Sequence, residues 1–312
     1  MNSKRVVVAG ASGLIGTALV QALAERGDTV VRLNRPNSAP HSALHTHSRI
    51  QDMAWDPQRA EIDQFIIDSA DAVINLAGAG IGDKRWTPAY KDTILRSRLA
   101  ATSTLATAIA HSTTPPHSFL SASATGFYGF PDQAVDESSK RGSTFLSGVC
   151  EQWENAAQPA LLSDTRVAFL RTGLVMSPQG GALGRLLPLL KVGLGGPLGS
   201  GKQVWSWITL EDHIRAVLHV LDNTDAWGPV NLVAPGATSN AEVTNALAAA
   251  LHRPAKFRVP AFALKFAVGE FSQEIVRGVL VRPALLESLN FEFNHPDTAH
   301  MARWIAADLQ SS

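Results

Sequence analysis

The feature that most restricts the fold of this chain is a set of three glycines that directly follows its first apolar run. Residues 6–8 are valines, a β-branched run typical of a buried strand, and Gly10, Gly13 and Gly16 follow at regular spacing. Beyond them, apolar residues recur with helical spacing at Leu14, Ala18, Leu19 and Leu23. The sequence therefore predicts a strand, a tight glycine turn and a helix at its start.

A glycine turn in this position suits a dinucleotide. The glycines allow a sharp turn and a close approach of a diphosphate to bare backbone, and the first N–H groups of the helix attract an anion. The spacing is G-x-x-G-x-x-G, whereas the commoner motif is G-x-G-x-x-G, and an ordinary strand-to-helix turn is the alternative. We expect the site to include Gly10, Ser12, Gly13, Leu14, Ile15 and Gly16.

The end of the second predicted strand, residues 29–33, bears on the choice of dinucleotide. An NAD site usually has an acidic residue here for the ribose 2′-hydroxyl, but this chain reads Arg32-Leu33-Asn34-Arg35. Two guanidinium groups suit a 2′-phosphate, so the sequence favours NADP. Two solvated arginines are the alternative.

Strands and helices alternate along the first half of the chain. After the glycine turn and its helix (residues 14–26), strands are expected at 29–33, 50–55, 72–78, 119–121 and 167–170, with helices at 88–111 and 144–161. Such alternation predicts an α/β fold, a Rossmann-type doubly wound parallel sheet.

Beyond Arg171 the pattern changes to Gly-, Leu- and Pro-rich segments, a strand at 204–208 and helices at 210–221, 241–251 and 261–280. We predict an NADP-binding domain at 1–172 and a small α+β substrate lobe at 173–312. A strand near 229–233 is expected to return to the first domain.

Charge and composition narrow the classes of partner. The 312 residues contain 27 Lys and Arg and 27 Asp and Glu, and no long basic run, which argues against nucleic acid or an anionic membrane. Cys150 is the only cysteine, which fits a reducing compartment. Residues 1–5 lead directly into the first strand, and no apolar run reaches the roughly 20 residues of a membrane span. We expect a cytoplasmic protein.

Two other motifs resemble a metal site and a nucleotide-binding P-loop, but we assign neither function to them. His41, His45 and His47 share a polar loop without a Cys or carboxylate beside them, so we expect no metal site. Residues 196–202 have the Gly and Lys spacing of a P-loop, but Gln203 stands where a Ser or Thr would hold magnesium. A strand-like run follows where a helix is required. A turn, or a glycine loop over a substrate phosphate, remains as the interpretation.

Taken together, the motifs resemble those of extended short-chain dehydrogenases/reductases. Within that superfamily the chain is similar to the NAD-dependent epimerase/dehydratase branch of YfcH-like proteins, often described as nucleotide-sugar epimerases. The matching segments are residues 10–16, 73–78, 84–87, 97–98, 121–129, 150–154, 171–175, 193–203, 207–208 and 231–235.

The resemblance implies a Rossmann domain with a C-terminal substrate lobe and NADP as the cofactor. It places Asn34 and Arg35 near the 2′-phosphate and Arg98 within reach of the cofactor. It also implies that the cofactor is lined by Leu76, Ala77 and Gly78, with Val175 near the nicotinamide. We expect a small-molecule substrate, with a sugar nucleotide as a candidate, and a homodimer as a candidate assembly.

The acid/base dyad typical of this superfamily is missing. Its enzymes generally use a Tyr with a Lys four residues later, because the lysine charge lowers the tyrosine pKa. The only tyrosines here are Tyr90 and Tyr128, followed four residues later by Ile94 and Asp132. Ser123 still occupies the position of the substrate-binding hydroxyl.

Two hypotheses therefore remain open. The first is an NADP-dependent epimerase or oxidoreductase in which Ser123 and Tyr128 are catalytic; a packing role is the alternative for Tyr128. The second is an NADP(H)-binding redox sensor or scaffold without turnover. Residues 83–86 form either part of a substrate mouth or an exposed loop anchored by one aromatic residue.

Overall fold

A large, mostly parallel sheet organises the computed structural model, which describes residues 3–36, 48–181, 183–184 and 186–311. The strand order is β12-β7-β6-β5-β1-β2-β3-β4, and each neighbouring pair is parallel except β3 and β4. The strands are β1 (Arg5–Ala9), β2 (Thr29–Asn34), β3 (Ile50–Asp56), β4 (Glu61–Ile62), β5 (Ala72–Asn75), β6 (Ser118–Ala124), β7 (Arg166–Thr172) and β12 (Gly228–Leu232). The predicted α/β class with a parallel Rossmann-type sheet is confirmed.

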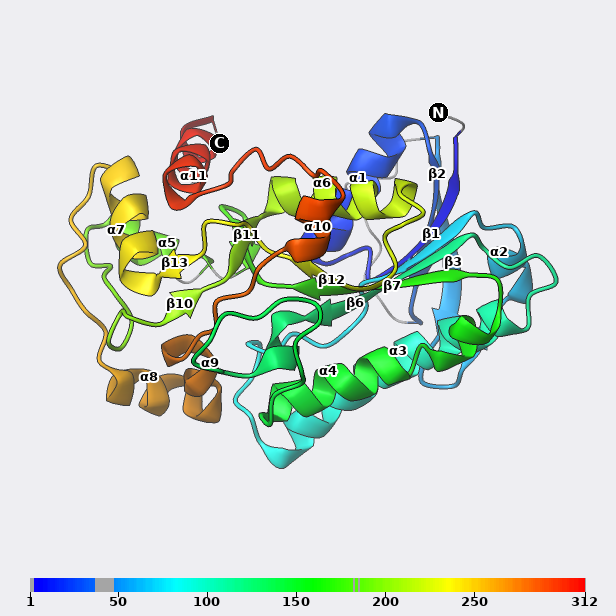
Figure 1. Ribbon diagram of the computed structural model, residues 1–312, viewed down its shortest axis with the longest axis horizontal. Helices are drawn as coiled ribbons and strands as arrows, with labels where there is room; N and C mark the ends of the chain where they lie inside the picture. Colours follow the sequence, from blue (N-terminus) through cyan, green and yellow to red (C-terminus); the bar gives the residue numbers. More distant parts are fainter. Residues whose placement is uncertain (1–2, 37–47, 182, 185, 312) are drawn as a thin grey trace.

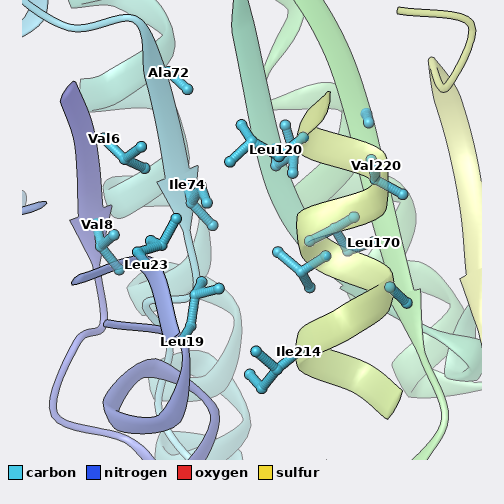
Figure 2. Close-up of a cluster of buried hydrophobic side chains, with 14 of the residues drawn as sticks. Val6, Val8, Leu19, Leu23, Ala72, Ile74, Leu120, Leu170, Ile214 and Val220 are labelled. Carbon is cyan, nitrogen blue, oxygen red and sulfur yellow. The ribbon is translucent and has the colours of Figure 1, made fainter. Parts of the chain in front are cut away.

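Helices cover both faces of this sheet (Figure 1). They include α1 (Leu14–Arg26), α2 (Gln64–Asp68), α3 (Pro88–Ala110), α4 (Phe145–Asn155) and α6 (Leu210–Asp222). Side chains alternate along β1, so Val6 and Val8 pack with α1 and α6, as Figure 2 shows, whereas Val7 packs with α3 on the other face. Burial on both faces explains why the central strands are continuous apolar runs.

The chain beyond β7 forms smaller sheets and helices around a separate core. β8 (Leu174–Ser177), β9 (Gly180–Gly181) and β11 (Trp207–Thr209) form one small sheet, and β10 (Val204–Trp205) pairs with β13 (Thr238–Ser239). Trp207, Leu190, Leu247 and Met301 belong to the core between α5 (Leu187–Lys191), α7 (Asn240–Ala250) and α11 (Thr298–Ser311). β12 leaves this part and pairs in parallel with β7, in the large sheet.

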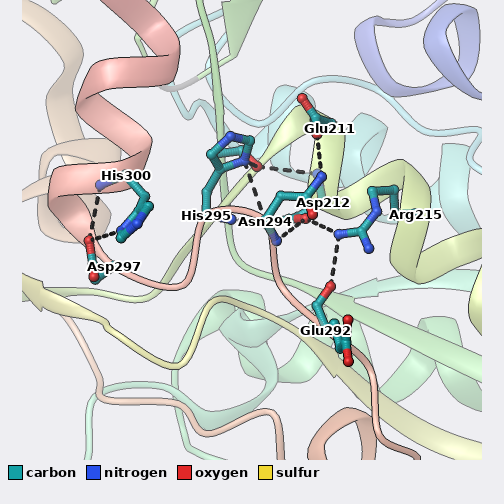
Figure 3. Close-up of polar contacts among 9 residues, drawn as sticks. Glu211, Asp212, Arg215, Glu292, Asn294, His295, Asp297 and His300 are labelled. Atoms are coloured by element: carbon teal, nitrogen blue, oxygen red, sulfur yellow. Dashed lines mark hydrogen bonds and ion pairs between the residues drawn. The ribbon is translucent and has the colours of Figure 1, made fainter.

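A buried carboxylate attaches the C-terminal segment to α6 (Figure 3). Asp212, in the first turn of α6, accepts hydrogen bonds from the backbone N–H groups of Asn294, at 3.0 Å, and His295, at 2.8 Å. Arg215 donates to the same carboxylate at 2.6 Å. This carboxylate therefore holds the segment that leads into α11.

The structure differs from the expected elements at several points. The helix expected over 144–161 ends at Asn155, and a 3-10 helix with Pro159 in its first turn, η2 (Gln158–Leu162), follows. The expected helix 261–280 is divided into α8 (Ala261–Val268), η3 (Gly269–Phe271) and α9 (Ser272–Val276), because Gly269 adopts a φ of +67°. The expected strand 204–208 is split between two sheets.

The sequence patterns did not predict the longer α11 or several short elements, which include α2, β4, β8, β9, α5, β13 and α10 (Ala284–Ser288). Among the described residues, no helix combines the length and apolar character needed to cross a membrane.

Candidate functional site

The glycine turn brings backbone against backbone at the carboxyl end of β1. Gly10 has a φ of +79°, and a Cβ added there would lie 2.6 Å from the carbonyl carbon of Leu76. A Cβ at Gly16 would lie 2.1 Å from the carbonyl oxygen of Gly10. Gly13, the N-cap of α1, has no side chain to occupy the first N–H groups of the helix. The turn therefore presents bare N–H groups at the positive end of a helix dipole.

The predicted neighbours of these glycines lie where β5 ends. The backbone N–H of Leu76 donates to the carbonyl of Ala9 at 2.9 Å, so the segment follows β1 closely. Asn75, fully buried, accepts from the N–H of Ala77 at 3.1 Å and donates to Thr102 of α3 at 2.8 Å. Asn75 therefore ties residues 76–78 to α3 and keeps them next to the glycine turn.

Arg98 approaches the same segment from α3. Its guanidinium donates to the carbonyl of Ala79 at 2.9 Å and lies 4.8 Å from the centroid of the Trp153 ring. A Cβ at Gly78 would be 3.2 Å from the Arg98 side chain. The structure therefore brings the predicted residues Gly78 and Arg98 into contact.

At the end of β2, one of the two predicted arginines has another role. Arg32 is 1% exposed and donates to both carboxylate oxygens of Asp52 on β3, at 2.8 and 2.6 Å. It is therefore not placed to bind a 2′-phosphate, contrary to the expectation from the pair of arginines. Asn34, which donates to Asp52 at 2.8 Å, and the exposed Arg35 lie at the strand end.

Val175, on β8, returns to the glycine turn from the second half of the chain. It packs against the core between α1 and the large sheet. A Cβ at Gly181 would lie 2.8 Å from the carbonyl oxygen of Val175 and 3.2 Å from the Leu14 side chain. Ile15 joins the same core, and Ser12 is exposed. The β8–β9 turn therefore closes over the start of α1.

Ser123 lies in a polar network that crosses β6, α4, β7 and β12. Its hydroxyl donates to Glu154 at 2.6 Å, and Glu154 receives two hydrogen bonds from Arg171, at 2.8 and 2.9 Å. Arg171 also donates to the Tyr128 hydroxyl at 3.0 Å, and that hydroxyl donates to Asn231 at 2.7 Å. The two predicted catalytic residues, Ser123 and Tyr128, thus belong to one network.

Within this network Tyr128 is buried, and its hydroxyl already both donates a hydrogen bond, to Asn231, and accepts one, from Arg171. The side chain is 2% exposed, and burial raises its pKa. Arg171 lies over the neighbouring Phe127 ring, 3.5 Å from its centroid. This geometry favours the packing interpretation of Tyr128, and its catalytic role stays a prediction.

Two residues of α4 that pack against the segment after Ser123, Leu146 and Cys150, supply no acid or base to that segment. Leu146 is 7% exposed and packs against Gly126, where a Cβ would be 3.2 Å from the Leu146 Cβ. The Cys150 thiol donates to the carbonyl of Ala124 at 3.6 Å, and burial raises its pKa to about 12. Cys150 is therefore a protonated core thiol.

Glu154 and Arg171 are the site residues that sequence reasoning assigned no role. Arg171 did carry a usable signal, because it directly follows the apolar run 167–170, near the carboxyl end of a strand, where α/β proteins bind ligands. Glu154 could not be identified from the sequence, because nothing in the helical pattern of α4 shows that this residue faces Ser123 and Arg171.

The remaining motifs stay outside the site. Residues 196–202 form turns that pack against residues 257–261, and a strand, β10, follows. They lack the helix that a P-loop requires. His41, His45 and His47 lie outside the described residues. Among the residues that are described, no group of three or more His, Cys, Asp or Glu side chains could hold a metal ion.

Known proteins resemble this chain over nearly its whole length. The model of the NAD dependent epimerase/dehydratase family matches residues 6–233, and a domain of unknown function, DUF1731, matches residues 259–305. An epimerase family protein of Mycobacterium bovis is 41% identical over 292 residues, covering 93% of both chains.

Two solved structures extend the comparison. The human epimerase family protein SDR39U1, crystallised with NADPH, is 31% identical with a TM-score of 0.88 and covers 97% of this chain and 99% of its own. A nucleoside-diphosphate sugar epimerase of Corynebacterium glutamicum is 31% identical with a TM-score of 0.76, covering 98% of this chain and 59% of its own. The family match and these relatives show that the chain belongs to the NAD dependent epimerase/dehydratase family.

Proposed function

We propose that this protein binds NADP(H) and acts as an epimerase or oxidoreductase on a small molecule, with a sugar nucleotide as the candidate substrate. The observation that carries the proposal is the glycine turn, where Gly10 and Gly16 leave no room for a side chain and the start of α1 presents free N–H groups. The human relative crystallised with NADPH and the sugar nucleotide epimerase of C. glutamicum support the two halves of the proposal.

The proposal assigns each part of the cofactor to residues of this chain. The Gly13 N–H donates to the Gly10 carbonyl at 3.2 Å and closes the turn, so the N–H groups of Leu14 and Ile15 face the diphosphate. The exposed Arg35, with Asn34, holds the 2′-phosphate. The cofactor is lined by Leu76, Ala77 and Gly78. Arg98 contacts this segment from α3, and Val175 lies towards the nicotinamide. When bound, the nicotinamide would accept or return a hydride. Residues 1–172 form the NADP-binding part and 173–312 the substrate lobe in this proposal.

Ser123 is the residue that would orient the substrate hydroxyl. Because its own proton is donated to Glu154 at 2.6 Å, its oxygen is an acceptor for a second hydroxyl. Arg171 fixes Glu154 through two hydrogen bonds, so the Ser123 hydroxyl keeps this orientation. Tyr128 remains the candidate acid/base, acting through the same network.

Cofactor titration by thermal shift tests the first half of the proposal. Ligands that bind the folded state raise the melting temperature by mass action, so NADPH and NADP should raise it at lower concentration than NADH and NAD. Arg35→Ala should remove that preference and leave the response to NADH unchanged. Equal responses to all four dinucleotides in the unaltered protein would contradict the assignment of NADP.

Hydride transfer tests the second half. With a panel of sugar nucleotides, the unaltered protein supplied with NADP should form NADPH as a sugar hydroxyl is oxidised to a ketone, or, where the hydride is returned, should convert the sugar nucleotide to its epimer. Ser123→Ala should abolish both products while NADPH still raises the melting temperature. Tyr128→Phe is expected to do the same if its hydroxyl transfers the proton. Turnover that survives either substitution removes that residue from the mechanism.

A protein that binds NADP(H) without turnover is the second candidate function. The observation in its favour is that Leu146 and the protonated thiol of Cys150 occupy the α4 face next to Ser123. This alternative predicts NADPH binding without hydride transfer to any sugar nucleotide, and turnover of a single one contradicts it.

A further inference from the structure

A pocket separate from the glycine turn and the Ser123 network lies between two segments that are far apart in the sequence. It has a volume of about 190 Å³ and lies between the loop of residues 82–85, before α3, and the end of α8 with η3. In Figure 1 the α8–α9 segment lies beside the start of α3, and Lys91 of α3 forms an ion pair with Glu270 of η3 at 2.5 Å. The pocket is therefore built where the two matched family segments meet.

The loop side of the pocket is held in place by side chains that follow it in sequence. Trp86 donates from its indole nitrogen to the carbonyl of Ile81 at 2.8 Å, and Tyr90 donates to the carbonyl of Gly80 at 2.5 Å. The Trp86 ring also packs against Phe271, with centroids 5.5 Å apart, and against Phe145 at 5.2 Å. Both walls of the pocket are thus anchored to one aromatic cluster.

The two walls differ in character. The loop wall contributes Lys84 and Arg85, and within the described residues neither has a carboxylate partner within ion-pair distance. The nearby acid Glu270 is already paired with Lys91. The Arg85 guanidinium lies against the backbone of Gly269, where a Cβ would be 3.4 Å from Nε.

Asp83 reduces this charge but does not cancel it. Its carboxylate lies over Gly80, 2.4 Å from where a Cβ of residue 80 would be. One acid against two bases leaves the loop wall with a net positive charge. The opposite wall is apolar and consists of Ala267, Val268 and Phe271.

We propose that this pocket binds the oxyanion end of a small organic molecule, a phosphate or a carboxylate. Lys84 and Arg85 supply the charge, and Arg85 presents a fork of donors that matches either group. Ala267, Val268 and Phe271 cover the adjoining carbon atoms. Pockets for whole drug-sized ligands measure about 300–1,000 Å³, so a pocket of about 190 Å³ takes one end of a larger ligand. That this ligand is the substrate rests on the proposed function.

Small probes of matched size test the pocket directly. Isothermal titration of the full chain with glucose 1-phosphate, glucuronate and glucose separates phosphate, carboxylate and uncharged binding. We expect one of the two anions to bind, glucose to bind at least about tenfold more weakly, and raised salt to weaken the anion. Equal binding of glucose and both anions, or no binding of either anion, overturns the proposal.

Matched variants locate the binding. Lys84→Ala and Arg85→Ala should each weaken the anion about tenfold, the effect of one lost charge-assisted contact. The control variants Lys202→Ala and Arg253→Ala, also of exposed cations, should not change it. Unchanged binding in both Lys84→Ala and Arg85→Ala overturns the proposal.

A second pair of variants changes the apolar wall. Ala267→Asp places a negative charge in the pocket and should abolish anion binding, whereas Ala267→Asn adds the same volume without charge and should retain most of it. If Ala267→Asp binds the anion as well as the unaltered protein, the site lies elsewhere. NADPH thermal shift on every variant keeps this test separate from the proposed function: anion binding without any NADPH response would overturn the latter alone.

Discussion

Two corners of the same sheet edge, the glycine turn after β1 and the Ser123 network after β6, are built in opposite ways. At the glycine turn, backbone meets backbone, and the absence of side chains at Gly10 and Gly16 creates the site. In the Ser123 network, charged and hydroxyl side chains from β6, α4 and β7 satisfy one another in a buried setting. The first corner depends on backbone approach, including that of Leu76 from the next strand, whereas the second depends on matched side chains far apart in sequence.

This contrast separates a site formed by the backbone from a site that depends on particular side chains. A backbone cradle recognises a diphosphate with almost any surrounding side chains. A proton-transfer site needs specific groups, and neither Leu146 nor the protonated thiol of Cys150 supplies one on α4. Four predictions test whether the two corners differ in this way.

The largest loss of stability is expected when the charge of Arg171 is removed. Arg171→Met leaves the Glu154 carboxylate, which is 11% exposed, without its partner, and removing one partner of a buried ion pair costs about 3–5 kcal/mol. Urea denaturation measures this loss. The double variant Arg171→Met/Glu154→Leu should recover part of it, since both charges are then gone. If the double variant loses the full sum, the network is not a coupled unit.

Substitution in the glycine turn should affect stability and NADPH binding together. A Cβ at Gly16 would lie 2.1 Å from the Gly10 carbonyl oxygen, so Gly16→Ala must shift backbone, and overpacking of this kind costs about 3 kcal/mol. Denaturation and NADPH titration measure both effects. As a control, Gly148→Ala in α4, where no atom lies within 4 Å of the new Cβ, should add about 0.5–1 kcal/mol. Full NADPH affinity in Gly16→Ala would show that the turn does not form the site.

His213, next to the Ser123 network, makes stability depend on pH. It is fully buried with Nε2 3.0 Å from the hydroxyl of Thr172, and burial lowers its pKa to about 4. Between about pH 6.5 and 4 the unfolded chain takes up a proton that the folded protein does not. The contribution of the neutral imidazole, at most about 3 kcal/mol, is therefore complete above pH 6.5 and lost as the pH falls to about 4.

Denaturation at a series of pH values checks this prediction. His213→Gln should flatten the decline between these two pH values, while the control His117→Gln, an exposed position, should leave it unchanged. An identical decline in His213→Gln would assign the pH dependence to other groups.

The smallest effect is expected from the Tyr128 hydroxyl. Tyr128→Phe removes the bridge between Arg171 and Asn231 but keeps the ring, which should cost about 1 kcal/mol and leave NADPH affinity unchanged. Denaturation and NADPH titration measure the two quantities. A loss of stability without a loss of turnover supports the packing role, and the reverse result supports catalysis.

Much of the fold and of the cofactor corner was predictable because those signals are local. The glycine turn, α1 and the parallel strands follow from residue patterns within single strand–turn–helix units, whereas the strand expected at 72–78 ends at Asn75 and residues 76–78 form a loop. The strand ends were correct to within a few residues, whereas helices interrupted by Pro159 and Gly269 were predicted too long. Local patterns of that kind show that a helix is present more reliably than where it ends.

The amino-acid sequence by itself determined the α/β fold, the glycine turn and the absence of a Tyr-x-x-x-Lys pair, because each depends on residue type at short spacing. Only the tertiary structure decided the partners of side chains distant in sequence. It assigned Arg32 to Asp52, joined Ser123 to Glu154 and Arg171, and set residues 82–85 opposite η3. Such contacts are selected by the packing of whole elements, a choice that no local pattern contains.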